Sequence, residues 1–354
     1  MTALLEARGL HKSFGGGLLD RTHTVALRDF SLALGEGQAS VTSVVGESGS
    51  GKTTLARLLL GLLTPTGGHV AYRGQDLATM SRGQRRRFRR EVQAIFQDPY
   101  EVYNPFYRVD HVLAMPVARF RLAASRAEAR FLIEGALHAV GLRPDETLGR
   151  FPHQLSGGQR QRVMVARALL LRPRVILADE PVSMVDASLR ATILGALRQL
   201  TQDLGIPVVY ITHDLATAYQ VSENIVVLYR GAVVEAGDVE EVVKRPQHPY
   251  TQLLIASIPL PAVERTWSST GGPAPPQPRP AADGAGCPFE DRCPSAMPVC
   301  RTSVPPLYRT GHHRAAACFL YQDAPALPGH EMATVFVGPP APPRPGPPGP
   351  PSGS

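Results

Sequence analysis

A glycine-rich segment near residue 50 carries residue types that bind phosphate. The run Gly46-Glu47-Ser48-Gly49-Ser50-Gly51-Lys52-Thr53 fits the pattern G-x-x-x-x-G-K-[ST] in full. Glycines let such a loop curl so that its N–H groups point at phosphate oxygens, and a following helix adds the positive end of its dipole. Lys52 would reach the β- and γ-phosphates of ATP, and Thr53 would bind Mg²⁺. The predicted nucleotide-binding loop comprises Gly46, Glu47, Ser48, Gly49, Ser50, Gly51, Lys52, Thr53 and Thr54.

Two adjacent acids could supply the remaining chemistry of ATP hydrolysis. The apolar run Val175–Ala178 is followed directly by Asp179 and Glu180. Asp179 is a candidate for ordering the Mg²⁺ shell, and Glu180 for polarising the attacking water. An apolar run that ends in two acids is also common where a strand leaves a core. Because a phosphate loop lies upstream, we favour the catalytic interpretation.

Strand-like and helix-like segments alternate around these residues. Short apolar, β-branched runs at Val41–Val45, Val175–Ala178 and Val208–Thr212 predict strands. Apolar spacing at Thr53–Leu63 and Leu189–Leu204 predicts helices. Strands that alternate with helices imply an α/β fold, with a parallel sheet covered by helices on both faces.

A second glycine-rich cluster precedes another predicted helix. Ser156, Gly157 and Gly158 lie directly before a helix that we expect to begin near Gln159. A helix start of this kind binds anions, yet no phosphate-binding lysine accompanies it. The chain therefore offers two half-sites, of which only the first holds a nucleotide by itself.

The segment Leu155-Ser156-Gly157-Gly158-Gln159 matches the signature of the ATP-binding cassette (ABC) ATPases, and the chain resembles that family over residues 10–240. Gln97 resembles the Q-loop glutamine and His213 the switch histidine. Asp186 resembles the D-loop aspartate, although Met184-Val185 replaces the usual Ala-Leu. Phe14 falls where the family stacks an aromatic ring on adenine; a core phenylalanine is the alternative.

The resemblance implies roles for these residues. The catalytic residues would be Glu180, His213 and Gln97, and the Mg²⁺ site would comprise Thr53, Gln97 and Asp179. Nucleotide contacts outside the phosphate loop would come from Phe14, Gln97, Asp179, Ser156, Gly157, Gly158, Gln159 and Asp186. In this family two ATPase subunits meet head to tail, and each signature covers the γ-phosphate held by the other subunit.

The family also implies a domain organisation. Residues 1–258 would form the nucleotide-binding domain, with a RecA-like P-loop ATPase core, an antiparallel β subdomain and an α-helical subdomain at about 99–165. The stretch 259–286 is rich in Pro and Gly and predicts a linker. Residues 287–322 contain all four cysteines and form a small C-terminal region. We expect the Pro-rich residues 323–354 to be a disordered tail.

Two further stretches resemble the oligopeptide/dipeptide and nickel importer ATPases: Gln97-Asp98-Pro99-Tyr100 and Gln247–Leu254, which contains His-Pro-Tyr-Thr. The resemblance implies an importer subunit on the cytoplasmic face of the membrane. Its partners would be a second, paralogous ATPase, two transmembrane permeases and an extracytoplasmic solute-binding protein, with a coupling helix received around Pro99–Leu155. Nickel, glutathione and other solutes are alternative cargoes, and an exporter ATPase is an alternative function.

Cys287, Cys293, Cys300 and Cys318 are the only cysteines of the chain. Their spacing matches neither zinc-finger pairs nor ferredoxin runs, so iron–sulfur, zinc, free thiols and disulfides all stay open. His312 and His313 could substitute as zinc ligands. Some of the peptide importer ATPases that this region resembles hold a [4Fe–4S] cluster there, and that resemblance favours iron–sulfur.

Composition excludes several classes of protein. The 354 residues are 43% apolar, which is enough for a sizeable core, and neither a secretory signal nor a membrane-spanning apolar run is visible. The net charge of +7 comes almost entirely from arginine. Six arginines lie between Arg82 and Arg90, where we expect a solvated helix face and no nucleic-acid partner.

Overall fold

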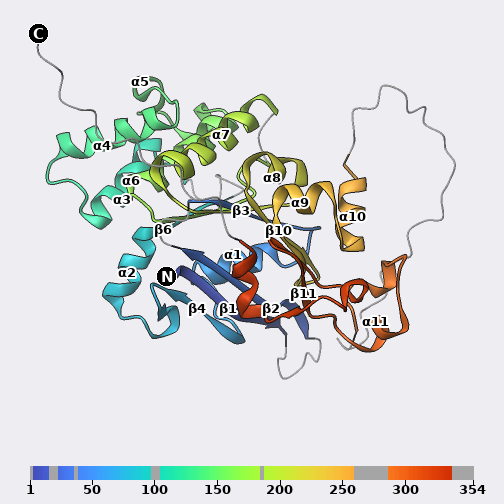
Figure 1. Ribbon diagram of the computed structural model, residues 1–354. Coiled ribbons are helices and arrows are strands. Elements are labelled where there is room, and N and C mark those ends of the chain that lie inside the picture. The colour runs from blue at the N-terminus through green and yellow to red at the C-terminus, as the bar shows by residue number, and fades with distance from the viewer. Residues whose placement is uncertain are drawn as a thin grey trace, which may run out of the picture.

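The computed structural model describes residues 3–15, 23–35, 39–96, 104–183, 187–258 and 286–336. Two sheets form its centre (Figure 1). The larger sheet has nine strands in the order β13-β11-β12-β10-β9-β3-β8-β7-β6. Its strands are β3 (Val41–Val45), β6 (Val92–Ile95), β7 (Val175–Asp179), β8 (Val208–Thr212), β9 (Asn224–Tyr229), β10 (Ala232–Asp238), β11 (Leu307–Gly311), β12 (Arg314–Ala316) and β13 (Ala326–Leu327).

The nucleotide-binding half of this sheet is parallel. Strands β6, β7, β8, β3 and β9 pair in parallel, so their carboxyl ends share one edge. All five residues of β3, β7 and β8 are buried, as expected for parallel strands with both faces covered. The three strands predicted from the sequence are confirmed, and β7 continues through Asp179.

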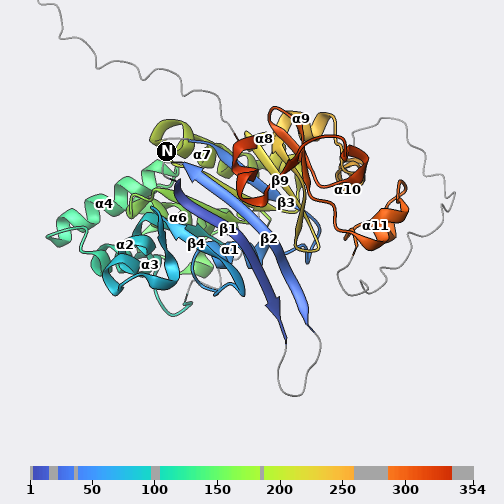
Figure 2. The same cartoon turned by 60° about the horizontal axis from the view of Figure 1, so that its bottom comes forward.

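A smaller antiparallel sheet packs against the first through helix α1 (Lys52–Leu59). Its strand order is β2-β1-β4-β5, and β1 and β2 form a long hairpin (Figure 2). One apolar core joins leucines of α1 to both sheets. The strands are β1 (Ala3–Phe14), β2 (Thr24–Gly35), β4 (Gly67–Tyr72) and β5 (Gln75–Asp76), followed by the 3₁₀ turn η1 (Leu77–Thr79).

Helices cover the opposite face and form a separate lobe beside β6 (Figure 1). The lobe contains α3 (Val109–Phe120), α4 (Arg126–Ala139), α5 (Pro144–Thr147), the 3₁₀ turn η3 (Pro152–Gln154) and α6 (Gly157–Leu170), and α7 (Ala187–Leu204) packs beside it. The expected core, antiparallel subdomain and helical subdomain are thus confirmed. The arginine-rich run forms α2 (Arg82–Glu91), which buries Phe88 and pairs Arg87 with Glu91 at 2.9 Å.

A third core lies against strands β3, β9 and β10 of the large sheet. It contains α8 (Leu215–Val221), α9 (Val239–Lys244) and α10 (Pro249–Ala256), and apolar residues of the cysteine region pack on it. The remaining elements are η4 (Glu290–Arg292), α11 (Pro298–Thr302), η5 (Phe319–Tyr321) and η6 (Gly329–Val335).

The sequence predicts a small C-terminal region at residues 287–322 but does not indicate how it attaches to the ATPase. Strand β12 pairs antiparallel with β10, so the region continues the large sheet instead of standing beside it. Arg314 on β12 donates to Glu235 on β10 at 2.6 Å, and the Glu235 side chain is fully buried. Removal of one partner of such a buried ion pair strongly destabilises the fold, because the other charge stays buried without a partner.

The expected start of a disordered tail at residue 323 is wrong. Strand β13 pairs with β11, and η6 then buries Met332 and Val335 against the core beneath β1 and β2. Leu327 and Phe336 of the same segment are buried in this core as well. Within the described ranges, no helix is long and apolar enough to cross a membrane.

Candidate functional site

The phosphate loop joins the carboxyl end of β3 to the start of α1. Its glycines are required by close backbone contacts. A Cβ on Gly46 would lie 2.2 Å from the Leu228 carbonyl oxygen, and one on Gly51 would lie 2.3 Å from that of Ala26. Gly51 also has φ +104°, a left-handed conformation that side chains disfavour. The loop is therefore seated against β9 and β2 in a shape that only glycine permits.

Lys52, the first residue of α1, turns back over this loop. Its Nζ donates to the carbonyl oxygens of Gly46 at 2.7 Å and Glu47 at 2.8 Å. The side chain is buried, and burial lowers the pKa of its ammonium, while Glu180 and Asp179 act in the opposite direction. The structure thus places the lysine between the loop and the two acids, which the sequence predicted as separate motifs.

Asp179 ends β7 and Glu180 directly follows it, beside the end of β8. Glu180 Oε1 accepts the backbone N–H of His213 at 3.0 Å and lies 2.7 Å from His213 Nδ1. Glu180 itself has φ +51°, a strained conformation for a glutamate of the kind that gathers at functional sites. The predicted acid and the predicted switch histidine, 33 residues apart, are in direct contact.

The donor set at this edge fits a hard divalent cation. Asp179 is buried, and its Oδ1 has no hydrogen-bond partner among the described residues. Burial, with Glu180 second, raises the pKa of Asp179 to about 6. Such an orphaned carboxylate oxygen is what an oxygen-binding ion such as Mg²⁺ would satisfy. Thr53 is the other described residue of the predicted Mg²⁺ set. It directly follows Lys52 and is exposed.

The signature motif caps α6, which begins at Gly157, two residues earlier than expected. Ser156 Oγ accepts the Gln159 N–H at 3.2 Å, and Gln159 Oε1 accepts the Ser156 N–H at 2.9 Å. This capping box orders the start of α6. Gly157 and Gly158, which have no side chains, are the first two residues of the helix. Between the described residues, no hydrogen bond or ion pair joins this motif to the phosphate loop. Within one chain the two half-sites stay separate.

Three further predicted residues have different outcomes. Gln97 and Asp186 lie outside the described residues. Gln161 of α6 donates to the carbonyl oxygen of Phe96, directly before Gln97, at 3.3 Å. Phe14 ends β1 with 42% of its surface exposed, and Lys12 Nζ lies 5.2 Å from its ring centroid. Phe14 is thus an edge residue and not the core phenylalanine of the alternative.

The four cysteines form no disulfide bonds with one another. Burial raises the pKa of Cys287 to about 11, and the other three thiols add to the rise. The Cys287 N–H also donates to the Cys300 carbonyl oxygen at 2.8 Å. However, among the described residues no group of three or more His, Cys, Asp or Glu side chains could hold a metal ion. The predicted [4Fe–4S] cluster therefore has no support in this geometry, and neither do zinc ligands at His312 and His313.

Sequence reasoning missed two residues that contact the phosphate loop. Arg292 donates to both carboxylate oxygens of Glu47, at 3.0 and 3.1 Å, and the Tyr250 hydroxyl accepts the Glu47 N–H at 2.9 Å. Tyr250 belongs to the His-Pro-Tyr-Thr stretch, which had been noted only as a resemblance. Nothing in the sequence marks Arg292 as a partner of a residue 245 positions away.

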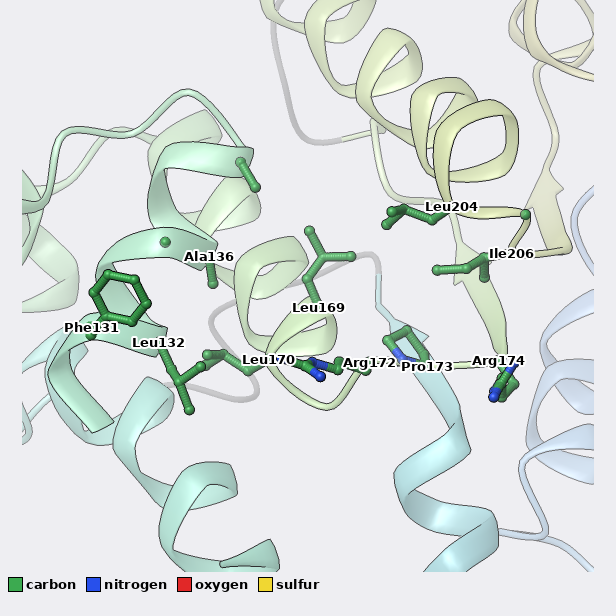
Figure 3. Close-up of a pocket in the computed structure, with 13 residues that line it drawn as sticks. Phe131, Leu132, Ala136, Leu169, Leu170, Arg172, Pro173, Arg174, Leu204 and Ile206 are labelled. Atoms are coloured by element: carbon green, nitrogen blue, oxygen red, sulfur yellow. The ribbon is translucent and has the colours of Figure 1, made fainter. Parts of the chain in front are cut away.

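Two hollows lie on opposite edges of the parallel strands. One, of about 400 Å³, lies at the carboxyl edge and is lined by Gly46, Glu180 and His213. The larger, of about 580 Å³, lies between α4, the end of α6 and the segments that lead into β7 and β8 (Figure 3). Its lining is mostly apolar and includes Leu132 and Ile206. Because the chemistry gathers at the carboxyl ends, the smaller hollow is the nucleotide side.

Comparison with known proteins agrees with this geometry. Residues 27–183 match the ABC transporter family, and residues 234–300 match the C-terminal region of oligopeptide/dipeptide transporters. A Brucella ovis protein with the provisional name peptide import ATP-binding protein is 41% identical over 323 residues, covering 89% of this chain and 97% of that protein. Oligopeptide transport ATP-binding protein OppF of Escherichia coli is 38% identical over 292 residues, covering 81% and 86%.

A solved structure has the same fold. The dimeric, post-hydrolysis state of the ATP-binding cassette MJ0796 bound to ADP and Pi superposes with a TM-score of 0.59. It is 29% identical and covers 66% of this chain and 98% of that one. A glycine loop under a buried lysine, two acids at the carboxyl end of the parallel strand β7 and a separately capped signature helix are the parts of an ATP-hydrolysing cassette. The chain belongs to the family of ABC transporter ATP-binding proteins.

Proposed function

We propose that this chain is the ATP-hydrolysing subunit of an importer of oligopeptides or dipeptides. The main support for peptides as the transported solutes is the match of residues 234–300 to the C-terminal region of oligopeptide/dipeptide transporters. The names of the relatives from Brucella ovis and Escherichia coli support it. The matched region is also continuous with the ATPase, since β12 extends the sheet that holds the phosphate loop.

The proposed chemistry is attack of water on the γ-phosphate of ATP. Glu180 would take the proton of that water, because it is the largely buried carboxylate beside the loop and His213 holds its Oε1. His213 would orient Glu180 and contact the γ-phosphate. Lys52 would exchange its two loop carbonyls for phosphate oxygens.

Thr53, Asp179 and Gln97 would hold Mg²⁺, which neutralises developing phosphate charge when it is bound. The unpartnered Oδ1 of Asp179 supports this assignment. Phe14 would lie against adenine, since its ring is exposed at the end of β1. For Gln97 the support is its sequence resemblance alone.

We further propose that a complete ATP site needs two ATPase subunits. Ser156 to Gln159, with Asp186, would contact the nucleotide held by the partner subunit. The separation of the signature from the phosphate loop within one chain supports this, as does the dimeric cassette among similar structures. The partner would be a paralogue, and two permeases with a solute-binding protein would complete the transporter at the cytoplasmic face of the membrane. The helical lobe α3–α6 would receive the permease.

The cofactor of the cysteine region is a separate proposal, which rests on the sequence resemblance alone. We propose a [4Fe–4S] cluster at Cys287, Cys293, Cys300 and Cys318, which would require these side chains to close further than described. Anaerobically purified protein should then be brown and hold iron near four atoms per chain. One zinc per chain without iron, or four freely titratable thiols, would reject the cluster.

The peptide assignment is tested by deleting the gene in its source organism. Uptake of a radiolabelled tripeptide should fall to background and return with the wild-type gene but not with Glu180→Gln. Nickel uptake and efflux of toxic compounds, measured in the same strains, serve as the comparison. Normal tripeptide uptake combined with loss of nickel uptake, or with loss of efflux, contradicts the peptide assignment.

A further inference from the structure

The C-terminal region contacts the phosphate loop through one arginine. Arg292, in η4, donates from two guanidinium nitrogens to the two carboxylate oxygens of Glu47, at 3.0 and 3.1 Å. Two parallel bonds of this kind fix the orientation of the carboxylate as well as its position. The Arg292 side chain is 23% exposed and that of Glu47 is 40% exposed, so the pair is only partly shielded from water.

Arg292 is itself held by aromatic packing. Its guanidinium lies 5.8 Å from the Tyr229 ring centroid and 5.6 Å from that of Phe289. Phe289 is fully buried and packs at 5.5 Å from Tyr250. The neighbouring turn is fixed as well, because Arg230, directly after β9, pairs with Asp291 at 3.1 Å. The arginine therefore reaches Glu47 from a rigid support.

Glu47 is also held through its backbone. The hydroxyl of buried Tyr250 accepts the Glu47 N–H at 2.9 Å, and the Tyr250 N–H is in turn bound by His248 Nδ1 at 3.0 Å. The carbonyl oxygen of the same residue accepts from Lys52 Nζ at 2.8 Å. Side chain, N–H and carbonyl of Glu47 are thus all engaged, two of them by residues C-terminal to position 249.

The position of Glu47 makes these contacts relevant to ATP binding. It lies between Gly46 and Ser48, in the loop whose N–H groups must converge on phosphate. Glycine-rich loops have many alternative conformations, and fixing one of them in advance lowers the cost of binding. A small hollow of about 170 Å³ is lined by Ser48 and Gly49 of the loop together with Arg292, so the arginine lies beside the loop.

We propose that Arg292 is a positioning residue for nucleotide binding, which acts through Glu47 to hold the phosphate loop in its binding conformation. The region after residue 286 is then a functional part of the ATP site as well as an attachment to it. Arg292 touches no nucleotide in this scheme; its effect reaches the phosphates through the loop backbone and Lys52.

The test measures binding of Mg²⁺–ADP to the full-length chain by calorimetry, because ADP needs no signature motif from a second subunit. We expect Arg292→Ala to raise the Kd about 5-fold, an effect kept modest by the solvent exposure of the pair. Arg292→Lys, which keeps the charge and one bond, should recover part of the loss. Steady-state hydrolysis should show a raised KM for ATP and a kcat changed by less than about 2-fold.

A double-mutant cycle separates positioning from simple attachment. Arg292→Ala should have no further effect on the Kd in a Glu47→Ala background. Arg301→Ala is the matched control, since Arg301 lies in the same region, is 77% exposed and pairs with Glu290. Equal effects of Arg301→Ala and Arg292→Ala, or additive effects of Arg292→Ala and Glu47→Ala, would overturn the proposal.

A second contact keeps the idea testable if Arg292→Ala unfolds. Tyr250→Phe removes only the hydroxyl that accepts the Glu47 N–H and should raise the Kd about 3-fold. Unchanged affinity in both Tyr250→Phe and Arg292→Lys would also refute loop positioning. All of these measurements use nucleotide alone, so their failure is distinguishable from failure of the peptide-import proposal.

Discussion

Replacement of Glu180 by glutamine tests the proposed general base while leaving the surrounding structure nearly unchanged. In the structure Glu180 Oε1 accepts the His213 N–H at 3.0 Å, and its side chain is 12% exposed. Glutamine keeps an oxygen in that position and nearly the same volume, so the backbone bond and the left-handed turn at this residue should persist. What Glu180→Gln removes is the negative charge and the capacity to take a proton.

The magnitude follows from these two losses. A positioned general base contributes about 10²- to 10⁴-fold to rate, so turnover should fall by at least about 100-fold, equivalent to about 2.7 kcal/mol in the barrier. Stability should change little, because the His213 side chain that contacts Glu180 is 60% exposed, and contacts between exposed polar side chains contribute at most about 1 kcal/mol. ATP affinity should be kept, since Lys52 and the loop are untouched.

The assay combines phosphate release under saturating Mg²⁺–ATP with size-exclusion chromatography. Glu180→Gln should bind ATP, release almost no phosphate and elute as an ATP-dependent dimer, with the paralogue present if two different ATPases are needed. Glu240→Gln, an exposed carboxylate bound to Lys244, controls for loss of one charge. Near-normal phosphate release by Glu180→Gln would refute the base assignment, and loss of ATP binding would refute the geometric reasoning.

The remaining predictions concern the buried pair of Arg314 and Glu235 and the lysine of the phosphate loop. Arg314→Met strands the fully buried Glu235 and should cost about 3–5 kcal/mol, lowering Tm by about 10 °C in a thermal melt. Arg301→Met should leave Tm unchanged, and an equal drop there would disprove the buried-pair explanation. Lys52→Ala should weaken Mg²⁺–ADP binding at least about 10-fold by calorimetry, because its ammonium lies over the loop. Wild-type affinity in that variant would show that the lysine does not face phosphate.

Local motifs accounted for most of the ATP site. Gly46 to Thr53 are consecutive, and their strand–loop–helix context is set by neighbouring residues, so the loop and the strands around it were predictable. The structure adds that β7 and β8 are parallel neighbours, so their carboxyl ends share an edge. The contact between Glu180 and His213 was not predicted from the sequence, which gave the two residues only as separate candidates.

Predictions failed where distant segments compete for the same surface. The sequence placed the four cysteines in a C-terminal region but did not show where that region packs; β12 pairs with β10, since an open sheet edge is readily satisfied by another strand. Residues 326–336 were expected to be disordered from composition, but Met332 and Val335 find an apolar site beneath β1 and β2. Composition reports what a segment could bury by itself, not what a neighbour offers it.

The sequence alone determined the parts of the ATP site: a phosphate loop, two acids at the end of a buried strand and a signature helix. Each of these is encoded within a few consecutive residues. Only the tertiary structure shows which distant residues hold the phosphate loop in place. Arg292 and Glu47 are 245 residues apart, and their pairing depends on Phe289 being buried between Tyr229 and Tyr250. Spacing along a chain carries no information about such a meeting, because it results from packing of the whole molecule.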